Sequence, residues 1–503
     1  MEKLPNNPEM TGKQSIQIEI PIYPFMKDHR FSGRIVIPAV ELCQVLALEI
    51  KKHIPDINNQ IIYNASFDKF IDINGDEKIT ALNEIKSYED GTFVSKLLTK
   101  TKTRSGIIRT NEHVSMDFRK DALPFKELTY DVASALDGLC LRVQPQEIYS
   151  ELVPFGPAYH NVTGDLYVAD SGAAACIVAP AEMSPGPLGS PFVFDAALHA
   201  ASVWAQRYHN TTAFPVAFSK RIILKPAEAG KKYFTRIIPV QSEAKIFKFD
   251  IWIYDYEGVL REAGFGVSFR DVTGGTLQTP EWITKNKNNL LYDILSKCDA
   301  FSVVELDQIP EFASKALSID ELRRLEPMRE KRRKSYTGAR LACKFLSRKL
   351  SKESFDLPAD KITTIINNIY PACPLPDGSM PYKCTVSHDS RFAVAAASRK
   401  RIGIDVEEIS ERVIELRKYY MSEEEQNLVD SSGLEKKAAC LRIWSIKEAV
   451  TKALDIDLTG SWKSVQVMDI GENITKFLIN NIENNAYHCT IDNHIFTLVQ
   501  FGE

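Results

Sequence analysis

The sequence lacks the features that mark membrane, secreted and zinc-binding proteins. No apolar run approaches the roughly 18 residues that a membrane-spanning helix needs, and residues 1–17 are polar, without the apolar stretch of a secretory signal. The nine cysteines are odd in number and never spaced as Cys-x-x-Cys, which argues against structural zinc and a disulfide framework. We therefore expect a cytoplasmic protein with no membrane partner.

An excess of positive charge is also missing. The chain has 62 Lys and Arg against 66 Asp and Glu, a formal net charge of −4, so we expect no nucleic-acid partner that requires a broadly basic surface. The apolar fraction of 44 % and the charged fraction of 25 % are typical of a folded globular protein. At roughly 100–200 residues per domain, the 503 residues predict two to four domains.

The first half of the chain is rich in short strands of alternating apolar and polar residues, for example 17–21, 249–254 and 264–269. Two segments, 38–54 and 195–208, are helical and apolar all round, which is typical of helices enclosed by the structure around them. The pattern predicts two similar halves, each a curved antiparallel sheet that wraps around one buried helix.

The composition changes to Thr, Gly, Lys and Asn between residues 270 and 289, which indicates a domain boundary. We predict a first domain at 1–273, a linker at 274–298 and a second domain at 299–503, in an α+β chain. Segment 320–352 carries twelve Lys or Arg against four Asp or Glu. Such a segment is either a solvated helix face or a surface that binds a polyanionic small molecule.

Two ionisable residues lie close to the predicted buried helices. His29 comes four residues before Gly33 and nine before Pro38, on a loop held by a tight turn and a helix start. Asp195 is predicted to be the N-cap of the second helix, and His199 follows one turn later on the same side. Histidines in loops are often simply exposed to solvent, and an aspartate at an N-cap often serves only to cap its helix. Further motifs are therefore needed to define a site.

Four motifs follow one another along this domain: His29-x-x-x-Gly33-x-x-x-x-Pro38, Phe155-Gly-Pro-Ala-Tyr159, Asp195-x-x-x-His199 and Phe214-Pro-Val216. Their order and spacing resemble those of dehydratase domains from polyketide synthases. The resemblance implies a double hot-dog fold with one active site, to which the first half contributes the histidine and the second half the aspartate. Two positions depart from the family's pattern, because Ala39 replaces a frequent glycine and Phe155 replaces a frequent tyrosine.

The implied reaction, dehydration of a β-hydroxyacyl thioester, needs a base and an acid. Neutral imidazole at His29 can remove the weakly acidic α-proton. Asp195 would protonate the leaving hydroxide. An apolar tunnel favours its protonated form, whereas a helix N-terminus favours the carboxylate. His199 would orient Asp195 or bind the thioester arm.

Carboxylates recur in the second domain. Alternation within residues 401–407 puts Asp405 and Glu407 on one face of a strand, about 6.6 Å apart, where both can reach one hard cation such as Mg²⁺. Residues 443–454 form a helix in which Glu448 and Lys452 share a face. The same two residues could equally form an ordinary surface salt bridge.

Three further motifs appear in order in this domain: Ser387-His388-Asp389, Gly403-Ile-Asp-Val-Glu407 and Trp444-Ser-Ile-Lys-Glu-Ala-Val-Thr-Lys452. They resemble the signature of 4'-phosphopantetheinyl transferases of the surfactin-synthetase type, although Gly378-Ser-Met-Pro381 is one residue longer than the family's usual Gly-x-Pro. The resemblance implies an α+β fold of two similar halves, with coenzyme A as co-substrate and Mg²⁺ as cofactor.

The same resemblance assigns roles to individual residues. Asp405, Glu407 and Glu448 would bind the metal, and Glu448 and Lys452 would assist transfer. Six residues would contact coenzyme A, the basic ones near its phosphates: Ser387, His388, Arg332, Arg333, Arg340 and Lys447.

Together these features predict a bifunctional enzyme that acts in trans on an acyl carrier protein of polyketide or polyunsaturated fatty acid type biosynthesis. The second domain would transfer 4'-phosphopantetheine from coenzyme A to a serine of the carrier, and the first would dehydrate the β-hydroxyacyl group carried there. The alternative keeps the transferase but makes the hot-dog domain a non-catalytic module that docks the acyl group or the carrier, an interpretation that Phe155 favours.

Overall fold

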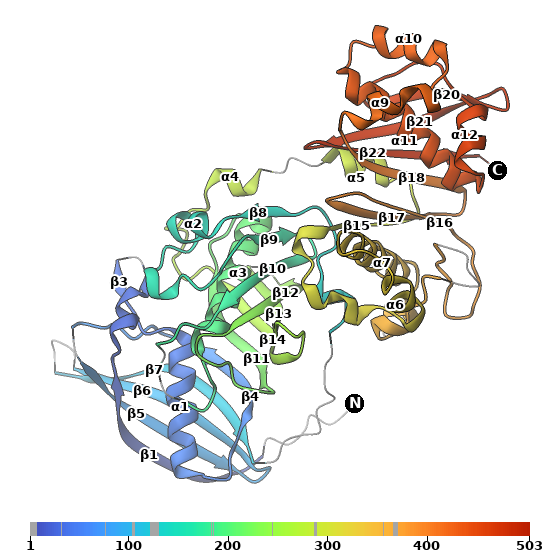
Figure 1. Cartoon of the computed structure of the whole chain (residues 1–503). Coiled ribbons are helices and arrows are strands. Elements are labelled where there is room, and N and C mark those ends of the chain that lie inside the picture. The colour runs from blue at the N-terminus through green and yellow to red at the C-terminus, as the bar shows by residue number, and fades with distance from the viewer. Residues whose placement is uncertain are drawn as a thin grey trace. The chain divides into compact units, whose positions relative to one another are not determined.

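A computed structural model describes residues 8–31, 33–75, 77–102, 106–120, 130–182, 184, 186–243, 245–285, 289–355, 357–365 and 371–502 (Figure 1). The chain divides into two compact units. The first comprises Met1–Thr129 and Leu141–Lys285, and the second comprises Tyr130–Cys140 and Asn286–Glu503. Among the described residues, no helix is long and apolar enough to cross a membrane.

The first unit is built on one antiparallel sheet, which has twelve strands in the described part of the chain. The first half supplies β1 (Met10–Pro21), β4 (Asn58–Phe67), β5 (Lys78–Tyr88), β6 (Thr92–Lys102) and β7 (Ile108–Arg119). The second half supplies β8 (Leu141–Val143), β9 (Leu166–Ala169), β10 (Gly172–Val178), β11 (Phe214–Ile223), β12 (Lys232–Glu243), β13 (Ile246–Asp255) and β14 (Leu260–Arg270). Strands β4 and β11 pair with each other, and this pairing joins the two halves.

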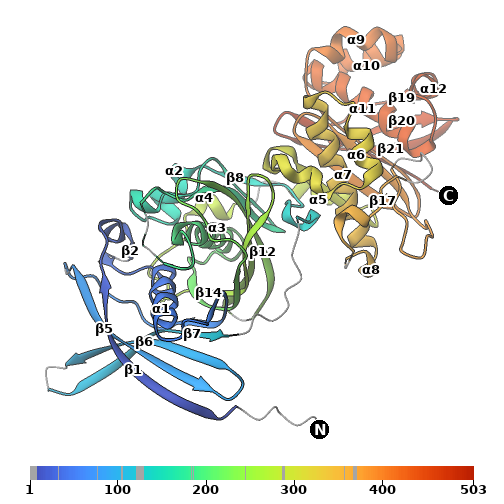
Figure 2. The same ribbon diagram turned by 60° about the horizontal axis from the view of Figure 1, so that its bottom comes forward.

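Each half encloses one helix, as the sequence predicted. Helix α1 (Ala39–His53) lies against the concave side of β5, β6 and β7, and α3 (Pro191–His209) lies against β9 to β13 (Figures 1 and 2). Residues 191–206 of α3 are all buried, which explains why this helix is apolar on every side. The double hot-dog architecture is therefore confirmed.

The start of α3 corrects one prediction. Asp195 is not the N-cap, because the helix begins at Pro191 and Ser190 precedes it with extended backbone. Proline is favoured in the first helical turn, since its fixed φ suits the helix and its missing N–H would have no partner there. Asp195 therefore lies in the second turn of α3, where the influence of the helix dipole is weaker.

The second unit contains two helix-on-sheet halves. Helix α7 (Glu330–Leu350) packs on the sheet β15 (Ala300–Glu305), β17 (Phe392–Ser398) and β16 (Lys383–His388). Helix α11 (Lys436–Leu454) packs on the sheet β18 (Arg401–Glu408), β22 (His494–Phe501), β21 (Ile482–Ile491), β20 (Ile474–Ile479) and β19 (Val465–Val467). This arrangement matches the predicted α+β fold of two similar halves.

Residues Tyr130–Cys140 interrupt the first unit in sequence but belong to the second unit, a feature that the sequence analysis did not anticipate. Asp131 accepts two hydrogen bonds from Arg348 of α7, at 2.7 and 2.8 Å. Asp137 pairs with Lys349 at 2.6 Å and accepts a hydrogen bond of 2.8 Å from Ser302. The segment is thus fixed to the first half of this unit by charged contacts.

The predicted linker at 274–298 contains secondary structure. Helix α4 (Glu281–Thr284) belongs to the first unit, and α5 (Asn289–Leu295) belongs to the second, where Leu291 and Leu295 are completely buried. Residues 286–288 of this linker lie outside the described residues.

Candidate active sites

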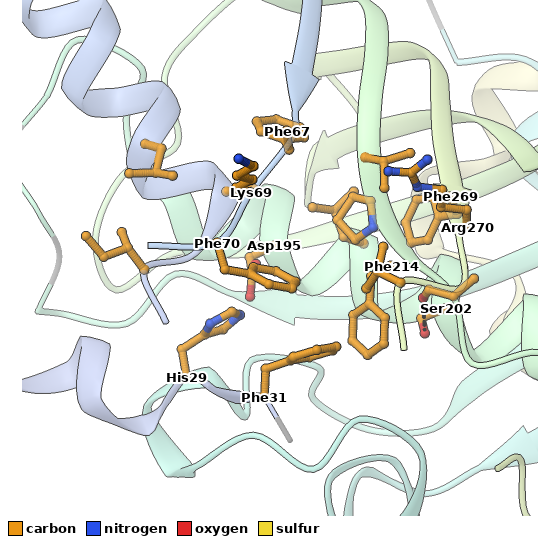
Figure 3. Close-up of a pocket in the computed structure, with 18 of the residues that line it drawn as sticks. His29, Phe31, Phe67, Lys69, Phe70, Asp195, Ser202, Phe214, Phe269 and Arg270 are labelled. Carbon is orange, nitrogen blue, oxygen red and sulfur yellow. Dashed lines mark hydrogen bonds between the residues drawn. The ribbon is translucent and has the colours of Figure 1, made fainter. Parts of the chain in front are cut away.

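A cavity of about 630 Å³ lies inside the first unit and brings together the residues that the sequence singled out there. His29, Asp195 and His199 all line it, and the His29 ring and Asp195 carboxyl point toward the same space (Figure 3). Six phenylalanines contribute to its wall: Phe31, Phe67, Phe70, Phe155, Phe214 and Phe269. An apolar chain and a polar reacting group can therefore occupy one cavity.

His29 follows the short helix η1 (Pro24–Asp28) and is only 8 % exposed. Its Nδ1 forms a hydrogen bond of 3.0 Å with the carbonyl oxygen of Val36. Because a carbonyl oxygen can only accept, Nδ1 carries the proton and donates it. The lone pair of the neutral ring is therefore on Nε2. Burial lowers the pKa of His29 to about 4, although the nearby Asp195 acts in the opposite direction. At neutral pH the ring is uncharged and can accept a proton.

Asp195 and His199 lie one turn apart on α3 and are 5 % and 3 % exposed. His199 Nε2 is 3.0 Å from Asp195 Oδ2, but the angles do not make a hydrogen bond. Neither this oxygen nor either ring nitrogen of His199 has a hydrogen-bond partner among the described residues. Buried polar atoms without partners are costly, so these atoms are available to a bound molecule.

The Phe155-Gly-Pro-Ala-Tyr159 motif packs directly beside the histidine. A Cβ on Gly156 would lie 2.6 Å from Cγ of Asp28, and only glycine allows this approach. The Phe155 ring centroid is 4.2 Å from that of His29 and 5.2 Å from that of His199. Tyr159, to which the sequence analysis gave no role, places its ring 5.2 Å from His29. Burial raises the pKa of Tyr159, so its phenol stays protonated.

In the second unit, Asp405 is the centre of a compact polar cluster. Its Oδ1 accepts a hydrogen bond of 2.9 Å from the Ser387 hydroxyl. The same oxygen forms an ion pair with Lys452 Nζ at 2.8 Å. Lys452 also donates to the Ser387 hydroxyl at 3.0 Å and to the Ile404 carbonyl at 3.1 Å. The structure thus brings together residues from β16, β18 and α11 that the sequence predicted to share a site.

Gly403 lets α11 approach β18 closely enough to form this cluster. A Cβ on Gly403 would lie 1.8 Å from the carbonyl oxygen of Ala449 on α11, a distance that no side chain tolerates. Glu448 and Lys452 lie on either side of this contact along the helix. Because Gly403 has no side chain, α11 can pack closely against β18, and this packing brings Glu448 and Lys452 to the cluster.

Glu407 and Glu448 are electrostatically coupled to Asp405. Burial, and then Asp405, raises the pKa of Glu407 to about 8, and the same two causes raise the pKa of Glu448. Among the described residues, no three His, Cys, Asp or Glu side chains are placed so that they could together hold a metal ion. Asp405 Oδ2 is nevertheless buried and has no hydrogen-bond partner in the described chain, and one such oxygen fits a hard cation whose other ligands come from substrate and water.

His388 ends β16 next to this cluster, in surroundings of positive charge. Burial lowers its pKa, and Lys452, Arg340 and Arg332 lower it further. Arg332 is exposed. Arg333 is also exposed and donates a hydrogen bond of 3.5 Å to the Glu326 carbonyl. The positive charges around His388 therefore favour its neutral form.

Two residues that were predicted to contact coenzyme A make contacts within the protein instead. Arg340 is completely buried and donates a hydrogen bond of 3.0 Å to the Thr364 hydroxyl. Lys447 Nζ is also buried, 2.7 Å from Glu425 and 2.6 Å from the Tyr420 carbonyl oxygen. These contacts place Lys447 in the core of the second half and away from the Asp405 cluster.

Comparisons with known proteins agree with both resemblances. Residues 401–499 match the family model of the 4'-phosphopantetheinyl transferase superfamily, a stretch that contains Asp405, Glu407, Glu448 and Lys452. Residues 128–279 match that of the polyketide synthase dehydratase N-terminal domain, which includes Asp195 but not His29. No curated protein sequence matches the chain.

Solved structures similar to this chain include several dehydratase domains. The dehydratase domain of a mycocerosic acid synthase-like polyketide synthase is 15 % identical, with a TM-score of 0.42, and covers 54 % of this chain and 94 % of its own. That of a trans-AT polyketide synthase from Brevibacillus brevis is 17 % identical, with a TM-score of 0.42, and covers 51 % and 93 %. One polypeptide thus carries a stretch, 128–279, that matches the polyketide synthase dehydratase model and another, 401–499, that matches the 4'-phosphopantetheinyl transferase superfamily model.

Proposed function

We propose that the chain is a bifunctional enzyme that acts in trans on an acyl carrier protein of polyketide or polyunsaturated fatty acid type biosynthesis. The second unit transfers 4'-phosphopantetheine from coenzyme A to a serine of the carrier, and the first unit dehydrates a β-hydroxyacyl thioester carried on that arm. The proposal places both reactions in the cytoplasm. The observation that carries the dehydratase is the convergence of His29 and Asp195 on one aromatic cavity.

In the dehydration, His29 is the base and Asp195 the acid. Nε2 of His29 takes the proton from the α-carbon, since Nδ1 is already bound to Val36. The electron pair of the broken C–H bond forms the double bond as the β C–O bond breaks, and the hydroxyl leaves as water with the proton of Asp195. Transfer of the proton from His29 to Asp195 then restores both groups. His199, beside Asp195 and with no hydrogen-bond partner for its ring nitrogens among the described residues, either orients the acid or binds the thioester arm.

In the transfer, the carrier serine attacks the β-phosphorus of coenzyme A and 3',5'-bisphosphoadenosine leaves. Glu448 accepts the serine proton. Lys452 neutralises charge that develops on the phosphate oxygens, and it is held ready by Ser387 and Asp405. His388, with Arg332 and Arg333, binds the phosphates of the nucleotide. Arg340 and Lys447, which the resemblance also placed near coenzyme A, keep the internal contacts described above and are given no such role.

Asp405, Glu407 and Glu448 are the residues that would hold Mg²⁺. When bound, the ion supplies positive charge that stabilises the pyrophosphate of coenzyme A. Mg²⁺ usually takes only one or two protein carboxylates together with substrate phosphates and water, so a complete cage of protein ligands is not required.

A second candidate for the first unit is a non-catalytic module that docks the acyl group or the carrier. Phe155 favours it, because its ring lies 4.2 Å from that of His29, where a tyrosine would offer a hydroxyl. The two candidates differ in whether the unit changes the acyl group or only binds it.

Hydration of a crotonyl thioester, the reverse reaction, tests the dehydratase. We expect the wild-type chain to form the β-hydroxyacyl product and His29→Ala and Asp195→Asn to lose nearly all of that activity. His160→Ala is the matched control, since His160 is bound to the Phe155 carbonyl and is not among the residues lining the cavity. If the wild type binds acyl carrier but forms no product, the docking module is the correct function.

Mass spectrometry of an apo carrier protein incubated with coenzyme A tests the transferase. We expect modification by the wild type with Mg²⁺, and loss of it with Asp405→Ala or after chelation of divalent metal. Undiminished modification in either case would contradict the proposed site.

A further inference from the structure

A buried hydrogen bond joins the turn after His388 to the other half of the second unit. Asp389 lies in the turn between β16 and β17, and His494 is the first residue of β22. His494 Nδ1 is 2.5 Å from Asp389 Oδ2, although the two residues are 105 positions apart in the chain. Their side chains are only 7 % and 3 % exposed. Since a carboxylate oxygen can only accept, the imidazole donates this hydrogen bond.

The other oxygen of Asp389 closes the turn itself. Its Oδ1 accepts hydrogen bonds of 2.8 Å from the backbone N–H groups of Arg391 and Phe392. The backbone N–H of Asp389 in turn donates to the Phe392 carbonyl oxygen at 2.9 Å. Burial opposes ionisation of this carboxyl, but the hydrogen bonds from His494 and from the two backbone groups lower its pKa overall. One carboxylate therefore shapes the turn with one oxygen and fastens it to β22 with the other.

The β22 end of this link has a fixed place relative to the acidic cluster. β22 pairs along the whole of β18, the strand that carries Asp405 and Glu407. In the turn before β22, Asn493 Nδ2 donates to the Ile409 carbonyl oxygen at 3.0 Å, and the Ile409 N–H donates to the Asn493 carbonyl oxygen at 2.8 Å. The hydrogen bond from His494 thus ties the turn of the first half to the sheet of the second.

His388 depends on this turn for its orientation. It is the last residue of β16 and immediately precedes Asp389. Burial and the surrounding positive charge lower the pKa of His388, so its neutral ring has a single N–H donor. A ring with one donor can bind a phosphate oxygen only when that N–H points at it. A shift of the turn would therefore change what His388 can bind.

We propose that Asp389 and His494 are positioning residues of the transferase: their hydrogen bond fixes the β16–β17 turn against β22 and so aims His388 at a phosphate of the nucleotide part of coenzyme A. The inference rests on the proposed transferase function. Neither residue of the pair takes part in the bond changes of the transfer. The pair joins the half that carries His388 to the half that carries the acidic cluster.

The kinetics of His494→Phe with coenzyme A test this role. Phenylalanine keeps a ring beside Phe392, whose centroid lies 5.1 Å from that of His494, but it cannot donate a hydrogen bond. The phosphate that His388 binds belongs to the nucleotide in both the ground state and the transition state. The KM for coenzyme A should therefore rise about tenfold, while kcat changes less than about twofold. His494→Asn supplies an amide N–H near the position of Nδ1 and should recover most of the affinity.

Asn493→Ala is the matched control, because it removes a side-chain hydrogen bond of the same turn that leads to Ile409 and not to the turn of His388. Its KM should stay within about twofold of the wild-type value. His388→Ala shows whether the effect passes through His388: adding His494→Phe to this variant should raise the KM no further. An unchanged KM in His494→Phe, an equal rise in Asn493→Ala, or additive rises in the double variant would each overturn the proposal.

Calorimetric binding of 3',5'-bisphosphoadenosine measures the same effect without transfer. Its dissociation constant should rise about tenfold in His494→Phe and in His388→Ala, and should stay at the wild-type value in Asn493→Ala. If the wild-type chain modifies no carrier protein but shows these differences in binding, the proposed transfer fails and the positioning role stands. If the chain transfers normally and all the variants bind the nucleotide equally, only the positioning role fails.

Discussion

Replacing Gly403 by alanine should disable the transferase from a position that touches no substrate. The added Cβ would lie 1.8 Å from the carbonyl oxygen of Ala449, 2.7 Å from its carbonyl carbon and 3.1 Å from the Ala453 nitrogen. All three atoms belong to the backbone of α11, which cannot rotate away as a side chain can. To restore ordinary contact, the helix must move by roughly 1.5 Å relative to β18.

This movement has two separable consequences. Overpacking of this kind costs about 1–3 kcal/mol in the free energy of unfolding. Lys452 holds Asp405 at 2.8 Å and Ser387 at 3.0 Å, and these contacts would be stretched beyond hydrogen-bond distance. Since a misplacement of about 1 Å can reduce catalysis by 10²-fold, we expect transfer to the carrier to fall by about that factor.

The assay compares Gly403→Ala with Gly338→Ala on α7. A Cβ on Gly338 would lie 2.2 Å from Cδ2 of Leu306, the movable end of a side chain, so this variant should lose less activity. Carrier modification is followed by mass spectrometry, and dehydratase turnover in the same sample confirms that the first unit is intact. If Gly403→Ala transfers at the wild-type rate, close packing of α11 on β18 does not position the site.

Three further predictions concern separate parts of the chain. Lys452→Ala should reduce carrier modification by about 10²–10³-fold, and a normal rate would contradict the role of this cation. Arg348→Ala removes two hydrogen bonds to Asp131. The urea midpoint for loss of transferase activity should therefore fall by an amount equivalent to about 1–2 kcal/mol. An unchanged midpoint would show that this contact does not stabilise the unit. Dehydratase activity should rise as the pH increases through about 4, because burial lowers the pKa of His29 to that value and only the neutral ring accepts a proton. A rise near pH 6.5, the ordinary pKa of histidine, would mean that the ring is more hydrated than its burial implies.

Local periodicity was sufficient to predict the elements that carry the sites. Alternation in residues 401–407 indicated a strand, and β18 spans Arg401–Glu408 with Ile402, Ile404 and Val406 buried on one face. The start of α3 was missed by four residues, although Ser190 followed by Pro191 is itself a helix-start signal.

Long-range contacts could not be predicted in this way. Segment Tyr130–Cys140 forms long-range hydrogen bonds to residues between 153 and 217 positions away, and no local pattern reports such partners.

Helix phase separates the two lysines that the sequence analysis grouped together on α11. Positions 447 and 452 are five residues apart, which turns the second by about 140° from the first around an α-helix. Since Lys452 faces Asp405 on β18, Lys447 must face elsewhere, and it does so in a buried ion pair with Glu425 at 2.7 Å. Glu448, four residues before Lys452, stays on the face of the cluster. The helix therefore uses one lysine for the site and the other to fix its opposite side against the core, and spacing alone could have told them apart.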